Sequence, residues 1–125
     1  MADNLACAEA MIAAYNALDF AGMEGQIAAN VDFAHFNRNF ALTSRDELIS
    51  VLRQFASDFF TERHFEPAER TIVSGDTVVR IGWYVGRCAI DLNGFGKAGE
   101  AFRLKFCSVL RFDDQGLILE WKDFG

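Results

Sequence analysis

The chain of 125 residues has the length of one domain, and a hydrophobic content of 51% with 13 phenylalanines can both fill a core and line a cavity. Its net charge of -6 argues against nucleic acid and anionic membranes as partners. No apolar run approaches membrane-spanning length, and the N-terminal stretch lacks the basic segment of a signal peptide. The three cysteines, Cys7, Cys88 and Cys107, follow no disulfide or metal spacing, so we expect reduced thiols in a cytoplasmic protein.

The first 30 residues show the spacing of two helices. Apolar residues recur one helical turn apart over residues 4–18, and Met11 and Tyr15 share one face of this predicted helix. Asp19 can then cap a shorter helix over residues 21–29, which its two glycines weaken.

A short strand and the clearest helix of the chain follow. Residues 31–36 alternate in polarity, which places Phe33 and His35 on one side of a predicted strand, and residues 37–43 are predicted as a loop. Residues 44–47 form a capping box, with serine at the cap and glutamate three residues later. The apolar stripe of the helix that begins there consists of Leu48, Val51, Leu52, Phe55 and Phe59.

The second half of the chain alternates between apolar and polar residues with a period of two. This pattern predicts four consecutive antiparallel strands. The strands are expected at residues 69–73, 77–90, 102–112 and 117–124. Asn93-Gly94 and the segment Asp113-Asp114-Gln115-Gly116 supply the turns of two hairpins. Helices segregated from an antiparallel sheet indicate an α+β domain, in which the twisted sheet wraps around the long helix and encloses an apolar pocket.

One glycine motif has a different explanation from its usual one. Residues 94–99 match the G-x-G-x-x-G spacing of dinucleotide-binding loops. Here the motif joins two strands, and no helix follows to receive a pyrophosphate, so we interpret it as a hairpin loop. The sequence shows no metal-ligand spacing, and we expect neither a metal nor a cofactor.

Three polar side chains interrupt faces that are otherwise apolar. Ser108 and Asp123 share the inward parity of the last two strands, and His35 shares that of the first. Asp123 lies beside Trp121 in the pattern, so burial would raise its pKa, while His35 has the pKa of a general base. Each also has a structural explanation, as a space-filling serine, a strand-end aspartate in solvent or a core histidine. Taken singly, the structural explanation is favoured, whereas convergence on one aromatic-lined interior would favour a site.

The order of elements, the capped helix and the terminal hairpin resemble the nuclear transport factor 2-like superfamily, and within it the ketosteroid isomerase and SnoaL-like polyketide cyclase branch. This resemblance implies a cone-shaped α+β domain with a pocket between helices and sheet, usually dimeric through the outer face of the sheet. The segments that carry it are YNALDF at 15–20, SRDELI at 44–49, GDTVV at 75–79, VLRFDDQG at 109–116 and EWKDF at 120–124.

The resemblance to the isomerases extends to only part of their site. Ketosteroid isomerases have an aspartate base in the first strand, where this chain has His35. Their oxyanion hole uses a tyrosine of the first helix and a protonated aspartate of the penultimate strand. Met11 and Ser108 occupy those places here, so that oxyanion hole is dismantled, although Tyr15 can supply a phenol from the next helical turn.

The resemblance to the epoxide hydrolase and cyclase branches extends to one acidic residue. The Arg-x-Asp pair of the epoxide hydrolases corresponds to Phe106 and Ser108, which cannot polarise an epoxide in the same way. Asp123 matches the final-strand acid of both branches.

These residues predict a pocket enzyme that acts on a small hydrophobic carbonyl compound. Asp123 or His35 would move a proton, and Ser108 or Tyr15 would bind the developing oxyanion. A non-catalytic protein that binds an apolar ligand, or a dimeric association domain, is the alternative. A homodimer is expected in either case. The residues expected to line the pocket are Met11, Phe33, Phe55, Phe59, Trp83, Phe106, Leu110 and Trp121.

Overall fold

The computed structural model describes residues 3–125. Its helices are α1 (Asn4–Asn16), α2 (Phe20–Glu24) and α3 (Arg45–Gln54), with a short 3-10 turn at Phe36–Arg38 and a π-helical turn at Phe55–Phe59. Its strands are β1 (Ile27–His35), β2 (Phe40–Leu42), β3 (Phe60–Phe65), β4 (Arg70–Ser74), β5 (Thr77–Cys88), β6 (Ala101–Phe112) and β7 (Ile118–Phe124). Within residues 3–125, no helix is long and apolar enough to cross a membrane.

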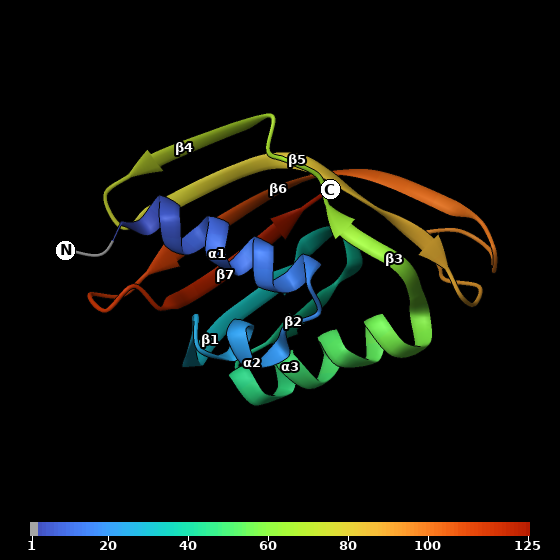
Figure 1. Ribbon diagram of the computed structural model, residues 1–125, viewed down its shortest axis with the longest axis horizontal. Coiled ribbons are helices and arrows are strands. Elements are labelled where there is room, and N and C mark those ends of the chain that lie inside the picture. Colours follow the sequence, from blue (N-terminus) through green and yellow to red (C-terminus); the bar gives the residue numbers. More distant parts are fainter. Residues whose placement is uncertain (1–2) are drawn as a thin grey trace.

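One curved sheet of seven strands carries the fold. Its order is β2-β1-β7-β6-β5-β3, and β4 pairs with the free part of β5. In Figure 1, α1 lies across one face of the long strands, and α3 lies below, beside β1 and α2. The α+β class with a sheet curved around helices is therefore confirmed. One pairing differs from the expectation of an antiparallel sheet, because β1 and β7 run parallel.

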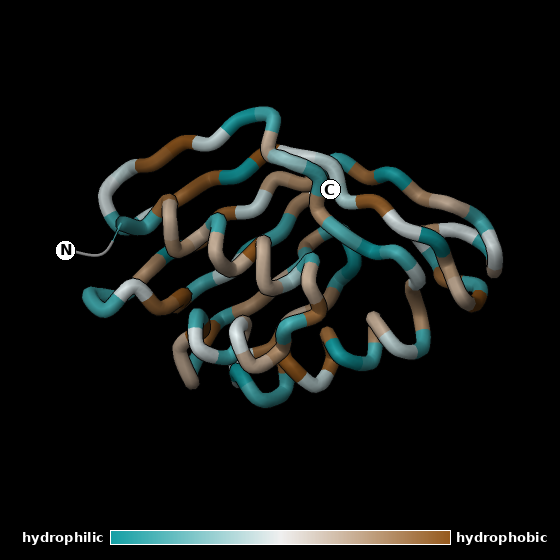
Figure 2. The backbone as a smooth tube through the Cα atoms, viewed as in Figure 1, coloured by the Kyte–Doolittle hydropathy of each residue, from teal (hydrophilic) through white to brown (hydrophobic). Residues whose placement is uncertain are grey.

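The long hairpins follow from alternating polarity, which Figure 2 shows as alternating colours along β5 and β6. These two strands pair without interruption from Thr77 opposite Arg111 to Arg87 opposite Ala101. At the next turn, Asp113 Oδ1 accepts hydrogen bonds from two backbone N–H groups, each at 2.9 Å. The predicted terminal hairpin is confirmed. A register shift between Arg111 and Phe112 accompanies the burial of Ile118, whereas Leu117 and Leu119 are half-buried.

Four parts of the structure differ from the sequence prediction. The long helix ends at Gln54, and its expected continuation is the π-helical turn, followed by strand β3. A bulge in β3 puts Glu62 at φ 59 and interrupts the alternation of polarity, so the sequence pattern did not predict this strand. β2 lies in the predicted loop and is too short to show a period. Residues from Ile27 onward belong to β1 and not to the second helix.

The expected orientation of Trp83 is wrong. β5 buries Val78, Arg80 and Tyr84 on the inner face, whereas Trp83 faces outward and donates its indole N–H to Glu69 Oε1 at 2.7 Å. The error has a physical cause, because the outer residues of β5 are mostly apolar and the inner ones include an arginine. Apolar alternation therefore favoured the wrong face.

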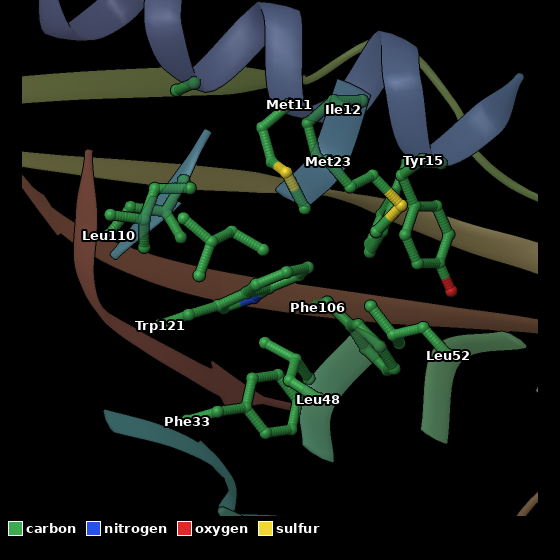
Figure 3. Close-up of a cluster of buried hydrophobic side chains, with 14 of the residues drawn as sticks. Met11, Ile12, Tyr15, Met23, Phe33, Leu48, Leu52, Phe106, Leu110 and Trp121 are labelled. Carbon is green, nitrogen blue, oxygen red and sulfur yellow. The ribbon is translucent and has the colours of Figure 1, made fainter. Parts of the chain in front are cut away.

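The core lies between α1, α3 and the concave face of the sheet. Figure 3 shows Met11 and Ile12 from α1, Leu48 and Leu52 from α3, and strand residues between them. Trp121 is near the centre, with its ring 5.2 Å from that of Phe33 and nearly perpendicular to it. Such edge-to-face contacts add to the stabilisation from burial.

Candidate functional site

Two adjoining hollows share part of their walls. The inner chamber is bounded by Tyr15 of α1, the π-helical turn and the inner face of the sheet, and the outer groove is bounded by the 3-10 turn, the π-helical turn and residues 92–95. The inner chamber has a volume of about 50 Å³, and its polar wall residues are Tyr15, His35, Tyr84 and Asp123. The outer groove has a volume of about 500 Å³. Both have walls formed by Phe33, His35, Phe55, Phe60 and Phe95. The groove and the chamber therefore share a largely aromatic wall.

Asp123 is the most perturbed acid of the site. It is only 4% exposed, and Trp121 donates its indole N–H to Oδ1 at 2.9 Å. Burial raises the pKa of Asp123 to about 6, although hydrogen bonds from Ser108 and Trp121 and the charge of Arg80 act in the opposite direction. The carboxyl therefore titrates close to neutral pH inside an aromatic wall.

Two tyrosines form a buried hydrogen-bonded pair beside this acid. The hydroxyl oxygens of Tyr15 and Tyr84 are 2.7 Å apart. Burial raises the pKa of Tyr15 to about 12 and that of Tyr84 well above its usual value, and the charge of Asp123 contributes to both. Both phenols are therefore protonated at neutral pH. One O–H serves the bond between them, and the second proton can be donated to another acceptor.

Sequence reasoning missed Tyr84 because it assigned the wrong face of β5 to the interior. A signal existed in the alternation itself. Tyr84 has the parity opposite to Trp83 and pairs with Leu104, which lies on the face that the sequence analysis assigned to the core. Registering β5 against β6 would have found it.

His35 lies next to Asp123 in the sheet, since the two are partners in the parallel pairing of β1 with β7. Its Nε2 is 3.4 Å from the carbonyl oxygen of Gly125, and its ring and that of Phe106 are nearly perpendicular, with their centroids 4.8 Å apart. Burial and the charge of Arg38 lower the pKa of His35, despite the contact with Gly125. The imidazole is therefore mainly neutral at pH 7, and it stands in both the inner chamber and the outer groove.

Ser108 serves the acid and is not part of the chamber wall. It faces Asp123 across the β6–β7 pairing and is 3% exposed. Its hydroxyl bonds to the Asp123 carboxylate and lowers the pKa of that carboxyl.

Of the eight residues expected to line the pocket, five do so and three do not. Phe33, Phe55, Phe106 and Trp121 line the inner chamber, and Phe59 lines the outer groove. Met11 and Leu110 are corrected to core residues, because they are buried and belong to neither wall. Trp83 lies on the other face of the sheet, as described above.

A third hollow is larger but chemically separate. It has a volume of about 930 Å³ and lies at the β3 bulge, with Arg63, Arg87 and Arg103 in its wall. It is wide and open, and it does not include Asp123 or either buried tyrosine. Within residues 3–125, no cluster of three or more His, Cys, Asp or Glu side chains could hold a metal ion.

Residues 8–121 match the family described as SnoaL-like domain. No curated protein sequence shows significant similarity to the chain.

Solved structures resemble the chain over nearly its whole length. An NTF2-like protein from Burkholderia thailandensis has 23% identity and a TM-score of 0.81, covering 99% of this chain and 91% of its own. A candidate polyketide cyclase from Xanthomonas campestris has 17% identity and a TM-score of 0.83, with coverages of 98% and 89%. An LEH-like epoxide hydrolase of M. tuberculosis has 16% identity and a TM-score of 0.76, with coverages of 97% and 80%. At these identities the likeness concerns the fold.

Proposed function

We propose that this chain, which belongs to the SnoaL-like domain family, is an enzyme that moves a proton on a small hydrophobic carbonyl compound. The observation that carries the proposal is Asp123, whose carboxyl lies in the wall of the inner chamber with a pKa of about 6. Such a group is ionised at neutral pH and is still a stronger base than an ordinary aspartate. A general base is most effective when its pKa lies near the working pH.

The tyrosine pair supplies what the reaction needs at the carbonyl oxygen. When a proton leaves the carbon next to a carbonyl, negative charge develops on the oxygen. A hydroxyl that is fixed in a dry site stabilises this charge more strongly than water does. Tyr15 and Tyr84 are held by their mutual hydrogen bond, and their raised pKa values keep them protonated.

The proposed step conserves atoms and charge. The Asp123 carboxylate takes a proton from the carbon, the C–H electron pair enters the carbonyl system, and the resulting enolate oxygen accepts the tyrosine O–H. The Asp123 carboxylic acid then returns the proton to the same or another carbon. Isomerisation, or ring closure through the enolate carbon, can follow from that intermediate.

The volumes of the hollows divide the substrate into two parts. A chamber of about 50 Å³ has room for the reacting end only, whereas the outer groove of about 500 Å³ has the size of a small-molecule site. The shared phenylalanines would pack on the substrate body and exclude water from Asp123. The neutral His35 would lie between the two parts.

Deuterium loss from the α-positions of a small α-deuterated cyclic ketone, followed by NMR, tests the proposal. We expect the catalysed rate to rise with pH around a midpoint of about 6, because the base must be deprotonated. Asp123→Asn should remove the catalysed exchange, whereas Asp114→Asn, at an exposed turn position, should leave it unchanged. If the ketone shifts resonances of chamber residues but no exchange occurs, the chain is a binding protein and the alternative function holds.

We also propose a homodimer formed through the outer face of the sheet. Half-buried apolar side chains cluster there on β5 and β6, where Val79 pairs with Val109 and Ile81 with Cys107. Trp83 extends this surface. Sedimentation should give a dimer for the wild type and a monomer for Ile81→Glu. A monomeric wild type at micromolar concentration would contradict the proposal.

A further inference from the structure

We propose that the outer groove binds a carboxylate through Arg38, so that the substrate is an apolar acid with its carboxylate at the groove wall and its carbonyl in the inner chamber. The inference deepens the proposed function, on which it rests for the carbonyl end. The carboxylate end rests on separate observations.

The charge of the groove is unusual for this chain. The whole sequence has a net charge of -6, yet within residues 3–125 the groove wall includes no aspartate or glutamate. Arg38 is its one permanently charged side chain, since His35 has a lowered pKa. A groove that has one cation, no anion and a phenylalanine-rich wall favours an apolar anion over a cation.

Arg38 is held in place but is not satisfied. Its guanidinium lies over the ring of Phe95, with Cζ 4.6 Å from the ring centroid. Its Nε is shielded from solvent and, among the described residues, has no hydrogen-bond partner. Gly94 lies close to this nitrogen, because a Cβ built at Gly94 would be 3.5 Å from Nε. Arg38 also forms no ion pair with any described residue, so the protein does not neutralise its charge and a ligand carboxylate can pair with the guanidinium.

The chemistry of the wall favours a carboxylate. A guanidinium matches the two oxygens of a carboxylate with parallel hydrogen bonds. Asn37, Asn39 and Asn93 also stand in the wall and add uncharged polar groups, but no second permanent cation. A phosphate dianion would therefore keep an uncompensated charge in the groove. One cation and a phenylalanine-rich floor fit a monoanion with an apolar body.

A matched ligand pair tests the inference by binding alone. We would titrate the protein by calorimetry at about pH 7.5 with 3-phenylpropanoate and with 3-phenylpropanamide, which differ in charge but little in shape. The wild type should bind the acid about tenfold or more tightly than the amide. Arg38→Met should bring the two affinities together while the amide affinity changes little. Arg38→Lys, which retains charge without the planar fork, should keep part of the preference.

Arg53→Met is the matched control. Arg53 also stacks on a phenylalanine, with its Cζ 4.6 Å from the ring of Phe20, but it lies outside the groove. This variant should retain the full preference for the acid. The inference is overturned if the wild type binds neither ligand, if it binds both equally, or if Arg38→Met keeps the preference.

Binding and catalysis can fail separately. Asp123→Asn should keep the preference for the acid, because Asp123 is not in the groove wall. A chain that prefers the acid but exchanges no α-deuterons would overturn only the proposed function. A chain that exchanges α-deuterons of the ketone but shows no preference for the acid would overturn only the carboxylate assignment.

Discussion

Replacing Asp123 with asparagine should raise the free energy of unfolding, relative to the wild type, as the pH rises from about 4 to 8. Burial raises the pKa of this carboxyl from 3.8 to about 6, so the folded state holds the proton more tightly than the unfolded chain does. Stability from this group is therefore full below about pH 4 and is lost as pH rises through about 6. The complete loss is about 3 kcal/mol, from 1.36 kcal/mol per pKa unit over the difference between 3.8 and 6.

The test compares the free energy of unfolding of the wild type with that of Asp123→Asn at each pH. Asparagine does not titrate, and its Oδ1 can still accept the indole N–H of Trp121. From pH 4 to pH 8, the free energy of unfolding of Asp123→Asn should gain about 2.4 kcal/mol relative to the wild type, by the two-state linkage relation. Urea titrations at several pH values give this difference, and Asp114→Asn should give a nearly flat one. A flat difference for Asp123→Asn as well would refute a raised pKa at this position.

Further substitutions test other parts of the structure. Tyr84→Phe should lower the free energy of unfolding by about 1–3 kcal/mol, because the hydroxyl of Tyr15 loses its buried partner. The double Tyr15→Phe and Tyr84→Phe variant should cost less than the sum of the single ones, and additive urea-titration values would contradict the bond. Met23→Ala should cost about 2–5 kcal/mol in the same assay, since the side chain is fully buried, and Ile72→Ala on the surface should cost under about 0.5 kcal/mol. Gly116→Ala should lower the thermal midpoint, because this turn residue has φ 81 and a side chain in that conformation costs about 1–2 kcal/mol. An unchanged midpoint would exclude strain at this position.

The sequence predicted those elements whose periodicity was uninterrupted. The β6–β7 hairpin and the capped helix α3 were predictable because alternation, turn residues and a cap agreed. β3 was not, since the bulge at Glu62 breaks its alternation. A bulge is defined by pairing with the neighbouring strand, which a single segment does not reveal.

The candidate site was predictable only in part, and for a similar reason. Strand parity placed Asp123 and His35 on inward faces, but only the β1–β7 pairing makes them neighbours. Tyr84 was missed because apolar residues occupy the outer face of its strand as well. The role proposed for Arg38 could not be predicted from the sequence, because this residue lies in a turn without periodicity. The proposal depends on the absence of acidic residues from the groove wall within residues 3–125, which only the folded structure reveals.

The parallel pairing of β1 with β7 also sets the order in which the protein can mature. During synthesis, β1 leaves the ribosome long before its partner β7, and meanwhile an apolar strand presents one unpaired edge. Contacts between segments so distant in sequence form slowly, because a long loop must close first. Phe33 and His35 then meet Trp121 and Asp123 only in this late step. We therefore expect the chamber to be among the last features to form.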